Sequence, residues 1–182
     1  METQFAEGTL AVQVIVLVQP PVSLEDAPLR ETLKAVLAAP VARRVLALGG
    51  PGEDWLPAGF DLMRQRGGDY GERMAAALAD AYATAALPML LIRAGALEIS
   101  ADILEDAARS VISVEADSAF GPAWDGGFWL LGLRQPDRSL VAGIPAPGDG
   151  AGRLLLERLA TAGLRVALAP RLEIAGAPAL RF

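Results

Sequence analysis

The sequence predicts an α/β fold in three layers (α/β/α) with a mostly parallel central sheet. Two observations carry this prediction. Short apolar segments alternate with longer amphipathic ones, as in strand–helix–strand units, and several short segments are apolar throughout, as in strands covered on both faces. The chain has 182 residues, of which 53% are hydrophobic, which is enough for one domain with a large core. We therefore expect residues 1–182 to form a single domain.

The N-terminal part of the chain contains the clearest strand–helix–strand unit. Residues 11–18 (AVQVIVLV) are almost entirely apolar and are followed by two prolines, which predicts the first strand. Ser23 is a typical N-cap with acidic residues just after it, so we expect a helix from there to the residue before Pro40. Residues 41–48 form the second expected strand, which a glycine-rich turn closes. Two strands joined by a helix favour parallel pairing.

The middle of the chain repeats this alternation. A short strand near residues 60–64 precedes a long expected helix over residues 69–87, whose apolar residues recur at the spacing of one helical face. Residues 88–93 (PMLLIR) predict another buried strand. Ser100 then caps an expected helix that continues through Val111.

The C-terminal part completes the expected sheet. A short strand near residues 118–120 leads to a fully apolar or glycine strand over residues 128–133. A helix is expected over residues 153–162, with Gly163 in the position that commonly ends a helix. Residues 164–169 form the last expected strand, and the remaining tail is expected to be irregular.

The chain contains no cysteine and no histidine. Disulfides, thiolate metal sites, histidine bases and serine–histidine triads are therefore excluded. A bound metal ion would need oxygen ligands, which favours magnesium, manganese or calcium. Any acid or base must come from Asp, Glu, Tyr, Lys or Arg.

The net charge is −6, from 16 basic and 22 acidic residues. The basic residues are scattered and form no stripe interleaved with aromatic residues, so we expect no nucleic-acid partner. The apolar run nearest the N-terminus is too short to span a bilayer and has no basic segment before it, so we expect a soluble, cytoplasmic protein with no membrane partner.

The segment 120–133 (FGPAWDGGFWLLGL) is the most informative in the chain. Asp125 stands between Trp124 and two glycines, directly before the apolar strand. If that strand is buried, the carboxylate lies at the edge of the sheet where open α/β folds bind ligands. However, Asp-Gly before a strand is also a strong hairpin signal, and Trp124 can equally serve in packing. Both interpretations of this segment stay open.

A second block, residues 67–73 (GGDYGER), precedes the long central helix. Its glycines could approach a ligand at the helix N-terminus. Alternatively, Asp69 and Glu72 have the spacing of a capping box, and Arg73 could pair with Asp69 four residues away.

Three stretches of the chain resemble a known family. Residues 65–74 (QRGGDYGERM) are close to the family block Q-x-G-x-D-L-G-E-R-M, and residues 120–133 are close to L-G-P-A-x-D-G-G-Y-Y-L-I-G-L. Residues 140–145 (LVAGIP), followed by a helix and a strand, are the third. On these blocks the chain is similar to the bacterial glycosyltransferase-like proteins associated with radical-SAM and selenium-related gene clusters. These are small members of the glycosyltransferase-A, or nucleotide-diphospho-sugar transferase, superfamily. The resemblance covers roughly residues 10–180 and implies that fold.

The departures from the family pattern concern phosphate and metal binding. The family has a basic, glycine-containing loop after the first strand, whereas residues 19–26 here (QPPVSLED) contain neither lysine nor glycine and include two acids. The aspartate that the family is expected to use for a metal is replaced by Gly95. Residues 174–178 (IAGAP) replace an acidic stretch, and Ala146–Asp149 keep only a glycine and the aspartate of a fourth block.

The resemblance and the residues together define a candidate site. Asp125 is the catalytic candidate, as a base or a carboxylate of the acceptor site, and Arg93 could supply a fixed positive charge in place of a metal, although it could also be a solvated strand end. No metal ligand is assigned, and a magnesium or manganese ion would be weakly held at most. The candidate substrate-binding residues are Gly68, Asp69, Glu72, Arg73, Arg93, Trp124, Gly126, Gly127 and Asp149.

These features predict a glycosyltransferase-like protein with a degenerate phosphate- and metal-binding site, for which the expected partner is a nucleotide sugar or another small molecule. One alternative is an inactive relative that acts as a binding or interaction protein, also as a homo-oligomer. A small-molecule nucleotidyltransferase ranks last, because it would need a basic, glycine-rich loop after the first strand.

Overall fold

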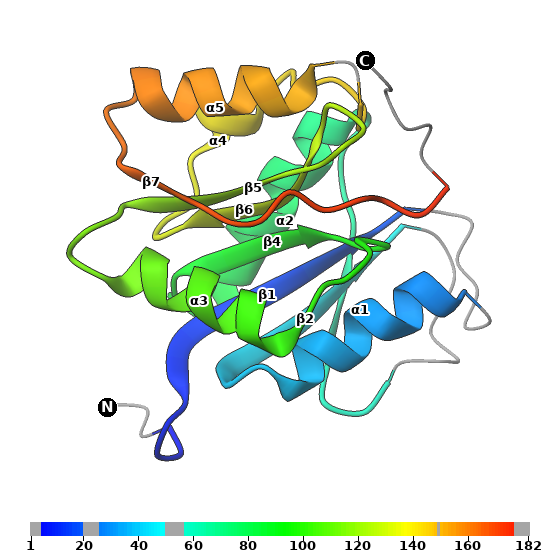
Figure 1. The fold of residues 1–182 in the computed structure, drawn as a ribbon, viewed down its shortest axis with the longest axis vertical. Helices are drawn as coiled ribbons and strands as arrows, with labels where there is room; N and C mark the ends of the chain where they lie inside the picture. Colours follow the sequence, from blue (N-terminus) through cyan, green and yellow to red (C-terminus); the bar gives the residue numbers. More distant parts are fainter. Residues whose placement is uncertain (1–4, 20–25, 50–56, 149, 177–182) are drawn as a thin grey trace.

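The computed structural model describes residues 5–19, 26–49, 57–148 and 150–176, which form one seven-stranded sheet with helices on both faces (Figure 1). The strands are β1 (Leu10–Val18), β2 (Val41–Leu48), β3 (Asp61–Arg64), β4 (Met89–Arg93), β5 (Ser118–Pro122), β6 (Phe128–Leu133) and β7 (Val166–Leu168). The helices are α1 (Ala27–Ala38), α2 (Tyr70–Thr84), α3 (Ala101–Ile112), α4 (Arg138–Val141) and α5 (Ala151–Thr161).

The strands follow the order β3-β2-β1-β4-β6-β5-β7 across the sheet. All neighbouring strands are parallel except β6, which is antiparallel to both β4 and β5. The mostly parallel sheet predicted from the sequence is therefore confirmed. Residues 118–133 form a β-hairpin, as the Asp-Gly signal indicated.

The helices divide into two layers. Helices α1 and α3 cover one face of the sheet, whereas α2, α4 and α5 cover the other (Figure 1). The central strand β1 supplies both cores, because alternate side chains point to opposite faces: Val14 and Val16 lie in one core and Ile15 and Leu17 in the other. This explains why the strand is almost entirely apolar, and it confirms the three-layer architecture.

Several element boundaries differ from the expected ones. Helix α1 begins at Ala27 with Asp26 as its N-cap, whose carboxylate accepts from the Leu29 amide, and the expected cap Ser23 lies outside the described residues. Helix α2 ends at Thr84, before the expected residue 87. Helix α5 begins at Ala151, two residues before the expected start. Strand β7 is limited to three residues, and the four-residue helix α4 was not expected.

Reversal of β6 determines what lies at the carboxyl edge of the sheet. The parallel strands β1, β2 and β4 end at this edge, and β6, running the other way, begins there. The turn before β6 is therefore brought next to the end of β4, although the two are about thirty residues apart in the chain.

None of the described helices has the length and apolar character needed to cross a membrane. The cytoplasmic location stays a prediction.

Candidate functional site

The candidate residues Arg93 and Asp125 meet at the carboxyl edge of the sheet. Arg93 is the last residue of β4, and its Nη1 lies 2.7 Å from Asp125 Oδ2. The two side chains are only 15% and 6% exposed. The interpretation of Arg93 as a solvated strand end is therefore wrong: it forms a buried ion pair. The pair lies beside the junction of β1 and β4, where the sheet's winding reverses and where ligands bind in open α/β sheets.

The second oxygen of Asp125 is engaged as well. Asp125 Oδ1 accepts from the Gly127 amide at 2.9 Å, so both carboxylate oxygens have a partner within the protein. Gly126 has a φ of 84°, a conformation that other residues rarely adopt. At Gly127, a Cβ atom would lie 3.1 Å from Asp125 Oδ1 and 3.5 Å from Arg93 Nη1. The two glycines are thus required by the turn and by the ion pair.

Helix α5 packs directly against this turn. The Gly152 amide donates to the Gly126 carbonyl at 3.1 Å, and a Cβ at Gly152 would overlap the Gly127 carbonyl oxygen. The first turn of α5 therefore touches the backbone of the candidate site. Asp149, the remaining candidate just before this helix, lies outside the described residues.

Tyr70 is a neighbour of the ion pair that the sequence interpretation did not select. It is the first residue of α2, is 5% exposed, and its ring lies 6.5 Å from that of Phe128. Burial raises the pKa of Tyr70 to about 12, and the charges of Arg93, Asp125 and Arg73 act on it in opposing directions. One signal could have identified it: Tyr70 stands where the family block has leucine.

The residues before α2 form a helix cap. Asp69 Oδ1 accepts from the Glu72 amide, and Glu72 Oε2 accepts from the Gly68 amide, both at 2.8 Å. Arg73 Nη1 donates to the Gly68 carbonyl at 3.3 Å, so this group does not make the i, i+4 pair with Asp69 that the sequence allowed. The capping interpretation therefore describes Gly68, Asp69 and Glu72. Arg73 Nε is buried and has no hydrogen-bond partner.

The loop after β4 does not offer a metal ligand. Gly95, which the sequence resemblance matches to an aspartate, has a φ of 89°, which disfavours any residue with a side chain. Its amide donates to Thr32 Oγ1, and its carbonyl accepts from the Ala175 amide at 2.9 Å. Across the described ranges, no three acidic side chains cluster in a way that could hold an ion. A divalent cation does not fit this donor set.

A segment near the end of the described chain connects the loop after β4 with the turn before β6. The Leu97 amide donates to Glu173 O at 2.7 Å, beside the contact between Ala175 and Gly95. One residue earlier, Leu172 exchanges backbone hydrogen bonds with Pro122 and Trp124. Residues 172–175 thus hold both parts of the site. This contact was not expected, since the tail had been predicted to be irregular.

Two pockets lie at this edge. The first, which we call the Arg93 pocket, has a volume of about 210 Å³ and is lined by Leu17, Val18, Gln19, Asp26, Arg93, Gly95, Pro147 and Ala175, among others. The second, the Trp124 pocket, has a volume of about 550 Å³ and is lined by residues that include Phe120, Trp124, Gly126, Gly127, Gly152, Arg153, Leu156, Leu168 and Arg171. The candidate residues therefore border two separate pockets.

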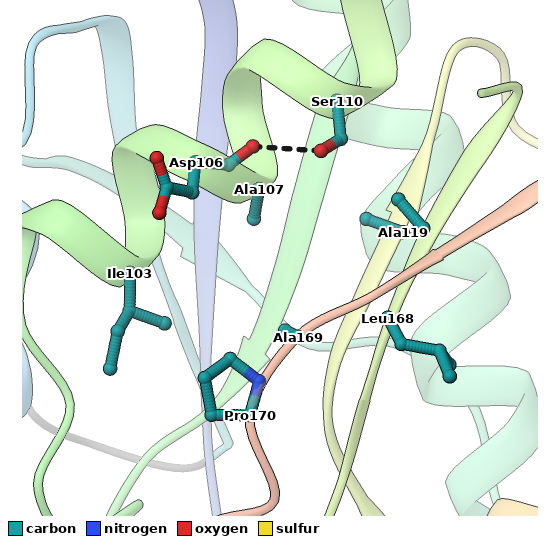
Figure 2. A pocket seen from close by; sticks show the side chains of 9 residues that line it. Ile103, Asp106, Ala107, Ser110, Ala119, Leu168, Ala169 and Pro170 are labelled. Carbon is teal, nitrogen blue, oxygen red and sulfur yellow. Dashed lines mark hydrogen bonds between the residues drawn. The ribbon is translucent and has the colours of Figure 1, made fainter. Parts of the chain in front are cut away.

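A third cavity lies away from the candidate residues. Figure 2 shows this space of about 120 Å³ between α3 and the segment Leu168–Pro170, with Ile103 and Ala107 on the helix side. Ser110 Oγ donates to the backbone carbonyl of Asp106 at 2.9 Å, which is a contact within the helix. None of the predicted site residues lines this cavity, and we do not assign the site to it.

Comparison with protein families identifies a match over most of the chain. A family described as uncharacterized proteins conserved in bacteria (DUF2064) matches residues 32–146. The chain belongs to this family. The match covers the end of β4, the Asp125 turn and α2, so the ion pair lies within the part that defines the family. No match was found among curated proteins.

Solved structures show the same fold. A proposed nucleotide-diphospho-sugar transferase from Desulfovibrio desulfuricans is 18% identical, with a TM-score of 0.77 over 92% of this chain and 83% of that chain. A mannosyltransferase from Pyrobaculum calidifontis, solved with GDP-mannose and Mn²⁺, is 16% identical, with a TM-score of 0.56 over 92% of this chain and 57% of that one. A Mycobacterium tuberculosis protein solved with manganese is 15% identical, with a TM-score of 0.57 over 96% and 94% of the two chains.

At these identities the similarity shows the fold. The glycosyltransferase-A-like fold and the resemblance to the glycosyltransferase-like family are therefore confirmed. The association with radical-SAM and selenium-related gene clusters stays a prediction.

Proposed function

We propose that this family member is a glycosyltransferase-like protein with a degenerate phosphate- and metal-binding site. In this proposal the Arg93 pocket holds part of a nucleotide sugar, or a smaller phosphorylated molecule, without a divalent metal, and sugar transfer has been lost. The observation that carries the proposal is the neutral ion pair: Asp125, the buried acidic residue of the site, is held by Arg93 and by the Gly127 amide, while Gly95 offers no carboxylate.

The electrostatics of the pocket support the loss of sugar transfer. Transfer from a nucleotide sugar releases a diphosphate, whose developing charge a metal ion or a set of cations must stabilise. Arg93 is the cation among the described residues lining the pocket, and its charge is balanced by Asp125. The other charged lining residue is the acidic Asp26. The described part of the pocket therefore carries no surplus positive charge for a leaving group.

A second candidate function is transfer without a metal. It is favoured by the position of Arg93, which lines the pocket from the end of β4 and could turn toward a diphosphate if its pair with Asp125 opens. The freed Asp125 would then be the base that the resemblance implies. Both candidate functions place the ligand in the Arg93 pocket. They differ in whether the sugar is then transferred.

The first experiment measures ligand-induced stabilisation. Thermal unfolding is followed with GDP-mannose, the ligand of the structurally similar mannosyltransferase, and with UDP-glucose, each with and without Mn²⁺. We expect at least one nucleotide sugar to raise the melting temperature equally with and without Mn²⁺. A rise that requires Mn²⁺ would contradict the metal-free site, and the absence of any rise would contradict nucleotide-sugar binding.

The double variant Arg93→Gln/Asp125→Asn tests the ion pair. It keeps hydrogen-bonding side chains but removes both charges, and we expect it to lose most of the ligand-induced rise. Glu105→Gln/Arg109→Gln is the matched control, because it removes the charges of an exposed ion pair on α3. Release of GDP from GDP-mannose, measured in parallel, separates the candidates: we expect none above the protein-free rate, and metal-independent release would favour transfer.

A further inference from the structure

We propose that the Trp124 pocket is a second ligand site, which takes an aromatic organic anion carrying a carboxylate or a phosphate. The inference goes beyond the proposed function, since it concerns a pocket on the other side of the Asp125 turn and does not depend on what the Arg93 pocket binds. The volume of about 550 Å³ is within the range of small-molecule sites, which is roughly 300–1,000 Å³.

Among the described residues that line the pocket, the charged ones are both arginines. These are Arg153 and Arg171, in a chain whose net charge is −6. No acidic side chain among the described residues pairs with Arg171, whose Cζ lies 4.8 Å from the centre of the Trp124 ring. Two arginines converging on one pocket of an acidic protein favour an anionic ligand.

Arg153 is available to such a ligand at little cost. Its Nη1 lies 2.7 Å from Glu157 Oε1, but the two side chains are 78% and 56% exposed. An exposed pair of this kind contributes little to stability, so Arg153 can exchange Glu157 for a ligand oxygen. The first two backbone amides of α5 are not free to bind the anion. Ala151 donates to the Gly148 carbonyl, and Gly152 donates to the Gly126 carbonyl.

The apolar part of the pocket favours a ring. Trp124 is 51% exposed and Leu168 is 69% exposed, and both belong to this pocket. Phe120 and Leu156 add further apolar surface at its base. A ligand ring placed against the indole would cover apolar surface that is now in water, while its anionic group reaches Arg171.

The experiment uses the indole N–H of Trp124 as its signal. The ¹⁵N-labelled protein is titrated with phenyl phosphate, phenylacetate, benzyl alcohol and inorganic phosphate, and the Trp124 signal is assigned with Trp124→Phe. Trp129 is the internal reference, since it is fully buried and its indole N–H donates to Pro170 O at 2.9 Å. We expect at least one aromatic anion to shift the Trp124 signal saturably, about tenfold more tightly than benzyl alcohol or inorganic phosphate.

Single-residue variants test the role of the arginines. Arg171→Gln should weaken binding of the aromatic anion about tenfold. Arg109→Gln is the control and should leave the affinity unchanged. Like Arg153, Arg109 belongs to an exposed i, i+4 ion pair, but it lies on α3 and does not line the pocket.

The outcomes are decisive in both directions. Tighter binding of phenyl phosphate or of phenylacetate identifies the anionic group and supports the proposal in either case. If benzyl alcohol bound as tightly as the aromatic anions, the pocket would not recognise the charge. If inorganic phosphate bound as tightly as the aromatic anions, the pocket would not recognise the ring. Either of these results would overturn the proposal. It would also be overturned by an unchanged affinity in Arg171→Gln, or by the absence of a saturable shift up to about 10 mM.

Discussion

The Arg93–Asp125 pair puts two opposite charges in a position where water has little access to either. Removing two charges from water is costly, and their mutual attraction and hydrogen bonds offset that cost only in good geometry. Here the distance is 2.7 Å, and the second carboxylate oxygen accepts from the Gly127 amide. Each partner therefore depends on the other, and the end of β4 is held to the turn before β6.

The first prediction concerns loss of one partner. Arg93→Ala leaves the Asp125 carboxylate buried without its counter-ion, so the free energy of unfolding should fall by about 3 kcal/mol or more. Arg93→Gln/Asp125→Asn should lose less than half as much, because no uncompensated charge remains. Urea unfolding at pH 7 measures both, and equal losses in the two variants would contradict the dependence of each charge on the other.

The second prediction concerns Gly95. Restoring the family's carboxylate with Gly95→Asp places a side chain at a φ of 89°, which should cost about 1–2 kcal/mol of stability. Because no further carboxylates cluster nearby in the described chain, Mn²⁺ should not raise the melting temperature of this variant. Gly95→Asn, which has the same shape without the charge, is the control. A Mn²⁺-dependent rise in Gly95→Asp alone would show that one residue suffices to restore the site.

The third prediction follows from the pKa of Tyr70, which burial raises to about 12. An unfolded tyrosine loses its proton near pH 10, so between these values the folded protein keeps a proton that the unfolded chain has lost. Stability must then fall as the pH rises above 10. Between pH 9 and pH 11 the native protein should lose about 1.4 kcal/mol more than Tyr70→Phe. Urea unfolding of both proteins measures this, and parallel losses would disprove the shift.

At the level of elements, the contact between α5 and the β5–β6 turn determines the shape of the site. The helix approaches so closely that the Gly127 carbonyl fills the space that a Cβ at Gly152 would need. The same turn carries Asp125 and borders the Trp124 pocket. Displacement of α5 would therefore alter both pockets.

The fourth prediction tests this contact. Alanine is the better helix former, yet Gly152→Ala should destabilise the protein by about 1–3 kcal/mol because its Cβ forces α5 away from the turn. Gly68→Ala is the matched control, since a Cβ there makes only an ordinary contact, 3.4 Å from Glu72 Oε2, and its change should be small. Thermal unfolding compares the two, and a Gly152→Ala protein as stable as the native one would refute the close contact.

Elements that express one dominant local pattern could be predicted from the sequence. Strands β1, β4 and β6 are almost entirely apolar because both faces are covered, and α3 follows its serine cap. Helix α4 was missed, because four residues are too few to show a helical period. The Asp125 segment is the hairpin turn that one interpretation predicted. It also lies at the carboxyl edge of the sheet, where open α/β folds bind ligands, but its role in binding stays a prediction.

Contacts between distant parts of the chain could not be predicted in this way. The pairing of Arg93 with Asp125 depends on the register of β4 against β6, in which Ile92 lies opposite Leu130. No local pattern encodes that register. The buried Gln13 is similar: it bonds the Ala85 and Leu87 carbonyls and accepts from Arg43, so only the assembled sheet explains a polar residue in an apolar strand.

At the level of the whole molecule, one continuous sheet joins both cores. Strand β1 contributes side chains to each core and pairs with β2 and with β4, which lie far apart in the chain. No strand of the described sheet is separated from the rest. This arrangement supports the single domain that we expect from the length of the chain.

The fifth prediction is that the protein unfolds in one cooperative step. Far-ultraviolet circular dichroism reports the whole backbone, whereas tryptophan fluorescence reports on Trp55, Trp124 and Trp129, of which Trp129 is buried in one core. In urea, the two signals should give coincident transitions. Separate midpoints would mean that the two helical layers unfold independently and would contradict a single domain.

Residues 172–175 fasten the loop after β4 and the turn before β6. Protein synthesis proceeds from the N-terminus, so a nascent chain carrying every candidate residue still lacks the segment that fastens these two parts. Residue 175 must leave the ribosomal exit tunnel before the Arg93 pocket, which Ala175 lines, acquires its final walls. Nascent chains halted earlier should therefore present an incomplete Arg93 pocket, even where most of the sheet has already formed.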